Sequence, residues 1–172
     1  MRKRWIQALL IPVVAVAAAV AVYAGTTHAT PQQGFSGTTL AKATFGNIRS
    51  HVQTKDPQFW NEVIHTEGES DLYVQENTWQ PGGSTGWHTH PGPSFVTVTQ
   101  GSVTAYDGDD PECAPHVYTA NTPNNSFVDP GDGHVHIIRN ETNAVAKTIA
   151  VQLVPAGAVR RVDAPAPGNC AF

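Results

Sequence analysis

Short hydrophobic runs recur between residues 71 and 154, and glycine, proline and asparagine separate them. Residues 71–79 alternate loosely between polar and apolar side chains, and residues 145–154 form the clearest run. Alternation of this kind favours strands, and many short strands separated by turns are typical of a β-sandwich or barrel. The sequence therefore predicts an all-β domain with strands at residues 38–44, 71–79, 95–98, 103–106, 117–119, 127–128, 134–139 and 145–154.

Two segments do not follow this pattern. Residues 30–37 contain glycine and serine and are predicted to form a flexible tether. Residues 56–66 contain a proline and several large apolar side chains, which fits a short helix or an ordered loop.

A length of 172 residues suits one domain. We therefore divide the chain after residue 29 into a tether and leading strand at residues 30–55 and a barrel domain with a C-terminal tail at residues 56–172.

Residues 1–29 have the composition of a targeting segment. Three basic residues at positions 2–4 precede an apolar run at residues 6–24, and small residues end the triplet at 27–29, as at an export cleavage site. An uncleaved membrane anchor helix is the alternative, because the run is close to the length that spans a bilayer. Both interpretations place the rest of the chain outside the cytoplasm, either secreted or held at the membrane by its N-terminus alone.

The balance of charges limits the partners that we expect. The formal net charge is −4, and no acidic residue lies in the first 29 positions. Without that segment, 7 basic residues stand against 14 acidic ones. An acidic surface argues against a nucleic-acid partner, and no segment has a helix-turn-helix pattern. The expected partner is a small-molecule ligand or substrate whose identity the sequence leaves open.

Two cysteines, Cys113 and Cys170, fit an extracytoplasmic location. An even number of cysteines in an oxidising compartment favours a disulfide bond. We expect Cys113 and Cys170 to pair and to tie the C-terminal tail to the barrel. Two free thiols are the alternative.

Four of the eight histidines form two His-x-His pairs, His88/His90 and His134/His136. Residues i and i+2 of a strand point to the same face, so each pair presents two imidazoles on one side. On the interior face of a barrel, three or four ring nitrogens can then converge on one transition-metal ion. A purely structural cluster is unattractive, because buried imidazoles repel one another when charged. Three of the other histidines, His51, His65 and His116, lack such a context and are expected on the surface or in loops.

The residues around both pairs resemble the two motifs of the cupin superfamily. The first motif consists of Gly, five residues, His-x-His, three or four residues, Glu, six residues and Gly. The second consists of Pro-x-Gly, two residues, His, three residues and Asn. The matching positions are Gly82, His88, His90 and Gly101 in the first motif, and Pro130, Gly133, His136 and Asn140 in the second, with one extra residue between Pro and Gly. The resemblance implies a single cupin-type jelly-roll β-barrel that binds a metal through His88, His90 and His136.

The chain departs from the first motif at its glutamate. Ser94 occupies the position of this missing Glu, or Phe95 if one more residue is counted, and neither replaces a carboxylate ligand. Some cupin-like thiol dioxygenases hold iron with three histidines, so the resemblance still implies a divalent transition metal, with Fe, Mn, Zn, Cu and Ni not distinguished. His134 shares a face with His136 and is the candidate for a fourth ligand, although it can equally lie at the barrel mouth.

Three classes of function fit these observations. The first is a metal-dependent enzyme of oxidoreductase or dioxygenase type, and the second is a non-catalytic extracytoplasmic module that binds a small molecule or a metal. The third is a structural domain. We expect no carboxylate beside the three histidines and hence no general base, which disfavours a hydrolase or an isomerase. Tyr73 and Glu76 are minor candidates for acid–base groups. The resemblance to cupins also makes a homodimer an option.

The apolar residues near the motifs are assigned to the core. Trp87 points away from His88 by the two-residue period of a strand, so we expect it to pack in the core. Phe95, Val96 and Val98 are likewise expected to pack inside the barrel.

Overall fold

A computed structural model describes residues 29–172, so residues 1–28 of the expected signal peptide or anchor helix lie outside the described part of the chain. The described residues form twelve strands and no helix, and hence no helix able to span a bilayer. The strands are β1 (Gln33–Phe45), β2 (Arg49–Thr54), β3 (Trp60–His65), β4 (Ser70–Ser84), β5 (His88–Thr89), β6 (Ser94–Gln100), β7 (Ser102–Asp107), β8 (His116–Thr119), β9 (Ser126–Asp129), β10 (His136–Arg139), β11 (Ala146–Pro155) and β12 (Val162–Asp163).

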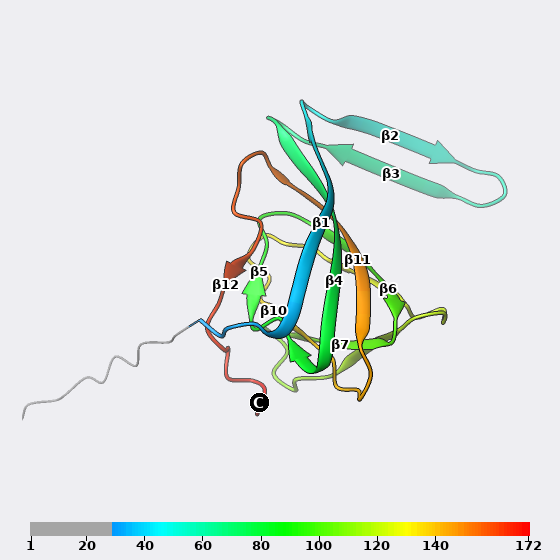
Figure 1. Ribbon diagram of the computed structural model, residues 1–172. Helices are drawn as coiled ribbons and strands as arrows, with labels where there is room; N and C mark the ends of the chain where they lie inside the picture. Colours follow the sequence, from blue (N-terminus) through cyan, green and yellow to red (C-terminus); the bar gives the residue numbers. More distant parts are fainter. Residues whose placement is uncertain (1–28) are drawn as a thin grey trace, which may run out of the picture.

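Ten of these strands form one antiparallel sheet that curls into a jelly-roll barrel (Figure 1). One layer contains β1, β4, β11, β6 and β9 in that order. The other contains β12, β5, β10, β7 and β8. Arg139 of β10 pairs with Ser84 at the end of β4 and joins the two layers. The all-β barrel predicted from the sequence is confirmed.

Alternation along the strands determines which side chains face the interior. In β6, Ser94, Val96 and Val98 are buried, whereas the residues between them are exposed. Val96 and Val98 therefore pack inside, as expected. The same expectation is wrong for Phe95, which is 54% exposed because it has the opposite parity in this strand.

Two groups of buried hydrophobic residues form the core. The larger is centred on Trp79 and Val98, and Phe35 packs against it with its ring centroid 4.9 Å from that of Trp79. The smaller contains Trp87, Tyr106, Ile137 and Ala164. The core position expected for Trp87 is thus confirmed, and this residue anchors the backbone immediately before His88.

The segment at residues 30–37 is part of the barrel and not a flexible tether. Thr30 donates its backbone N–H to the carbonyl of Ala164, 3.1 Å away, and β1 begins at Gln33 and pairs with β4. Pro81, Gly82 and Gly83 lie within β4. They form a bulge in β4, where the register with β1 shifts between the pairs Gln33–Ser84 and Phe35–Trp79.

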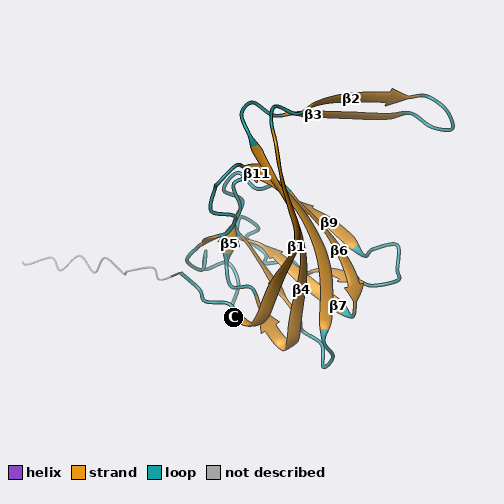
Figure 2. Ribbon diagram, turned by 45° about the horizontal axis from the view of Figure 1, so that its top comes forward, coloured by secondary structure: helices purple, strands orange, loops and turns teal. Residues whose placement is uncertain are grey.

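Strands β2 and β3 form a separate two-stranded hairpin that projects from the barrel, which we call the β2–β3 arm (Figures 1 and 2). It replaces the short helix or ordered loop expected at residues 56–66. The arm exposes large apolar side chains, with Phe59 68%, Val63 64% and Trp60 50% exposed. Its two ends meet at the barrel, where Ile48 and Thr66 exchange hydrogen bonds of 2.9 Å.

The expected disulfide between Cys113 and Cys170 is present, with the two Cα atoms 5.3 Å apart. Both cysteines pack against the smaller core group. Phe172 packs edge-to-face against Tyr106, with ring centroids 4.9 Å apart. The C-terminal tail is therefore fixed to the barrel by a covalent bond and by apolar packing.

Candidate metal centre

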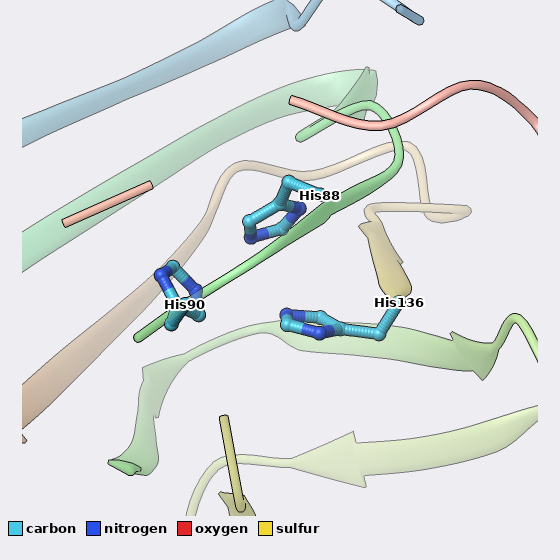
Figure 3. A group of neighbouring side chains, drawn as sticks. All are labelled: His88, His90 and His136. Atoms are coloured by element: carbon cyan, nitrogen blue, oxygen red, sulfur yellow. The ribbon is translucent and has the colours of Figure 1, made fainter. Parts of the chain in front are cut away.

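The two halves of the candidate site lie on neighbouring strands. His88 begins β5, His90 follows directly after it, and His136 begins β10. The backbone pairing of β5 with β10 places His136 opposite His88. The three rings point toward one another (Figure 3), and one nitrogen from each lies within 4.8 Å of the others. The structure therefore brings together the three histidines that the cupin motifs indicate.

Hydrogen bonds hold each ring in one orientation. The Nδ1 atoms of His88 and His90 lie 2.9 Å and 2.5 Å from the carbonyl oxygens of Gly86 and Arg160. Nδ1 of His136 lies 3.4 Å from the carbonyl of His134. A carbonyl oxygen only accepts hydrogen bonds, so each Nδ1 carries the proton and each Nε2 keeps its lone pair. This is the tautomer that a metal ligand bound through Nε2 requires.

Burial keeps the rings neutral. Desolvation, together with the nearby His136 and Arg161, lowers the pKa of His88 well below its ordinary value. Burial also lowers the pKa of His90, although its bond to Arg160 and the charge of Asp129 act in the opposite direction. For His136, burial outweighs the attraction of Asp129 and lowers the pKa to about 4. Neutral imidazoles are the form that binds metal ions.

A cavity of about 130 Å³, measured as the space open to the centres of water molecules, adjoins the three rings. One water needs roughly 10–15 Å³ of such space, so the cavity has room for a small organic molecule. Tyr73 and Glu76 do not line it; Glu76 faces outward and pairs with Lys147 at 3.3 Å. The polar side chains that line the cavity besides the histidines are Gln75, Asn77, Thr85, Ser94, Asp129, Gln152, Arg160 and Arg161.

The position of the missing glutamate does face this cavity. Ser94 is buried and lines the cavity wall, and its Oγ accepts a hydrogen bond of 3.1 Å from Nε2 of Gln152. The alignment that places Ser94, and not Phe95, at this position therefore agrees with the direction of the two side chains.

Asp129, at the end of β9, is a site residue that the sequence reasoning missed. It is only 4% exposed, lines the cavity, and places Oδ2 at 3.7 Å from Nε2 of His90. The expectation that no carboxylate lies beside the histidines is therefore wrong. A signal was present in the sequence, since Asp129 directly follows the apolar pair Phe127-Val128 and directly precedes the second motif.

His134 does not join the three converging rings. Its Nδ1 lies 3.3 Å from Oδ1 of Asp129, and its Nε2 lies 3.4 Å from Oδ1 of Asp107. Together with Asp129 and His136, it forms a second set of side chains that could hold a metal ion. This set shares His136 with the three converging histidines. The other described histidines are exposed, as expected: His51 on β2, His65 on β3 and His116 on β8.

No family model and no curated protein matches the sequence. Among solved structures, the chain is similar to a cupin superfamily protein from Desulfitobacterium hafniense, with 11% identity and a TM-score of 0.41 over 67% of this chain and 79% of the other. A double-stranded β-helix protein from Klebsiella pneumoniae is 21% identical, with a TM-score of 0.41 over 70% and 80% of the two chains. An oxalate oxidase is 19% identical, with a TM-score of 0.40 over 49% of this chain. The match spans 46% of the oxalate oxidase, less than half of its length.

Proposed function

The chain has the jelly-roll barrel typical of the cupin superfamily, and from this premise we propose that it is a metalloprotein acting on a small molecule outside the cytoplasm. His88, His90 and His136 bind one divalent transition metal, and the adjacent cavity takes up the small molecule. The Cys113–Cys170 disulfide supports the extracytoplasmic location, since disulfides persist in oxidising compartments.

One observation carries the metal site: the imidazoles of the buried His88 and His136 and of the half-buried His90 converge, and each Nδ1 is engaged with a backbone carbonyl. A structural cluster of histidines would use both nitrogens of each ring in hydrogen bonds, because buried polar atoms are rarely left without partners. Among residues 29–172, Nε2 of each ring makes no hydrogen bond. The carboxylate of Asp129 lies 3.7 Å from Nε2 of His90. The donor set fits an ion that prefers imidazole, namely iron, zinc, copper or nickel, with manganese also compatible once a carboxylate is added.

A transition metal in such a site supplies open coordination positions together with Lewis-acid or redox chemistry, depending on the ion. The protein itself contributes a partly enclosed cavity and a carboxylate, Asp129, within reach of the histidines. This carboxylate places a negative charge beside the three neutral rings, which favours a bound cation there. We therefore favour a metal-dependent enzyme, of oxidoreductase or dioxygenase type, over a purely structural domain.

The cavity also favours one class of small molecule. Arg160 lines it and is held by a 2.8 Å hydrogen bond to Oε1 of Gln75 and by the ring of Tyr73, 4.2 Å away. No carboxylate pairs with Arg160 within the described residues, whereas the neighbouring Arg161 pairs with Asp163 at 2.7 Å. A guanidinium left without a counter-charge beside a cavity suits a ligand that carries a carboxylate or another anionic group.

The test is elemental analysis of the full chain, exported by its host and purified without a histidine tag. We expect close to one transition-metal ion per chain, and the identity of that ion selects the reaction to assay on small carboxylic acids. A protein that is isolated empty and takes up none of the five candidate ions would overturn the proposal. A loaded protein that binds such acids without converting them would instead identify the non-catalytic binding module.

A further inference from the structure

We propose that Asp129 is a fourth ligand of this metal and supplies from β9 the carboxylate that the cupin motif places on β6. The inference rests on the proposed function, because it concerns the ion bound by His88, His90 and His136. It assigns to the site a residue outside both sequence motifs.

The register of the sheet carries the first step. β9 pairs antiparallel with β6, and Asp129 is the direct partner of Ser94. Partners in adjacent strands project their side chains from the same face, with Cβ atoms about 4.5–5.5 Å apart. Ser94 is the position of the missing glutamate, and both side chains line the cavity. A carboxylate on β9 therefore enters the same space as one on β6 would.

The contacts of the two carboxylate oxygens carry the second step. Oδ1 accepts a 3.2 Å hydrogen bond from the backbone N–H of Gly131 and lies 3.3 Å from Nδ1 of His134. Oδ2 is buried and has no hydrogen-bond partner among the described residues. It lies 3.7 Å from Nε2 of His90. One oxygen is thus anchored, and the other is left free next to the lone pair of a candidate ligand.

The unpartnered oxygen needs a counterpart. A buried carboxylate oxygen without a hydrogen bond is unfavourable, and two lone pairs that face each other gain nothing without a proton or a cation between them. Ligand atoms bind divalent transition metals at about 2.0–2.2 Å, so one ion can bridge atoms 3.7 Å apart. A carboxylate also gives the otherwise neutral three-histidine set the negative charge that the serine cannot supply.

The turn that follows Asp129 holds its carboxylate in place through a backbone hydrogen bond. Gly131 has φ +73°, and a Cβ there would lie 2.5 Å from the carbonyl oxygen of Gly92. Only glycine allows this close approach, which fixes the turn after β9 and keeps the Gly131 N–H on Oδ1 of Asp129.

The experiment measures binding of Co²⁺ to the metal-free full chain, both as affinity and as the visible absorption spectrum of the bound ion. The variants are Asp129→Asn, the double variant Ser94→Glu with Asp129→Asn, and the matched control Asp107→Asn. Asp107 also contacts His134 but belongs to neither group of metal-binding side chains.

We expect Asp129→Asn to weaken Co²⁺ binding by about tenfold or more and to change the spectrum, and the double variant to recover affinity to within about threefold. Asp107→Asn should leave both readouts close to wild type. An unchanged spectrum of Asp129→Asn, or a double variant that recovers nothing, would overturn the fourth-ligand assignment while the three-histidine site stands. A wild-type chain that binds no Co²⁺ would overturn the metal site itself.

A second variant covers the case in which Asp129→Asn does not fold. Asp129→Glu keeps the charge and moves the oxygens by one methylene group. The Co²⁺ spectrum changes if this side chain is a ligand. It stays the same if Asp129 only holds the turn and the ring of His134, and that result would contradict the proposal.

Discussion

His88 and His136 are direct partners in the antiparallel pairing of β5 with β10, and their ring centroids lie 4.3 Å apart. The site is therefore set by backbone register. β5 is only two residues long, and β10 begins at His136 itself. Trp87 and Ile137, the neighbours of these histidines, are buried in the smaller core group and hold both short strands in place. Along each of these two segments, a residue that packs in the core therefore stands next to a candidate metal ligand.

Replacing His88 with alanine should abolish tight metal binding and leave the barrel folded. The imidazole is lost while Trp87 still packs in the core. The loss of zinc affinity should exceed the roughly 10–100-fold that removal of an outer-shell partner costs. Competition titration measures the affinity, and far-ultraviolet circular dichroism checks the fold. His65→Ala, on the exposed face of β3, is the control. A metal-free His88→Ala protein that unfolds would indicate that the histidines are structural.

The metal-free protein should lose stability as the pH falls from 7 to 5. The pKa values of His88, His90 and His136 are lowered in the folded state, to about 4 for His136. In the unfolded chain the same rings take up protons near pH 6.5. Between these values the unfolded state binds more protons, so acid favours unfolding, at most by on the order of 1 kcal/mol per pH unit for a ring that is protonated only in the unfolded state. Urea unfolding at several pH values measures this slope. His136→Gln should make it shallower, and a flat wild-type profile would contradict the assignment of neutral buried rings.

Removing the disulfide should lower the free energy of unfolding by about 4 kcal/mol, because Cys113 and Cys170 are separated by 57 positions and the bond restricts the unfolded chain. The double variant Cys113→Ser with Cys170→Ser tests this by urea unfolding. A reducing agent should destabilise the wild type to a similar extent and leave the variant unchanged. Equal stability of wild type and variant would contradict this contribution of the bond to the free energy of unfolding.

Deleting the β2–β3 arm should leave the barrel and its metal site intact. No residue of the arm lines the cavity. The hydrogen bonds between Ile48 and Thr66 already bring the two ends together, so a short Gly-Ser loop can replace residues 49–65. We expect the free energy of unfolding to change by less than about 1 kcal/mol, since surface changes away from the core cost little. A large loss of stability or of metal affinity would mean that the arm packs against the barrel in solution.

The sequence predicts the barrel and the three-histidine cluster because both depend on local patterns. Alternation identifies the strands, and the two His-x-His pairs with their glycines identify the motifs. Asp129 is harder to find: its place next to the second motif is a weak local signal, and its position in the site depends on the long-range pairing of β9 with β6. Phe95 was misplaced for a related reason: its apolar character predicts burial, whereas its parity in β6 directs it outward. At residues 30–37, the glycines and serine suggest flexibility, but pairing of β1 with β4 overrides this local preference.

The position of β11 between β4 and β6 has a consequence for how the chain folds. Ile149 pairs with Glu76 on one side and with Thr97 on the other, so the last long strand inserts between two strands made much earlier. Such non-local pairing requires closure of long loops before any contact is gained, which places the barrel among slowly folding topologies. Gln152 on β11 and Arg160 after it also line the cavity. The ligand pocket is therefore complete only when β11 and the segment that follows it have joined the sheet, so the site forms late in folding.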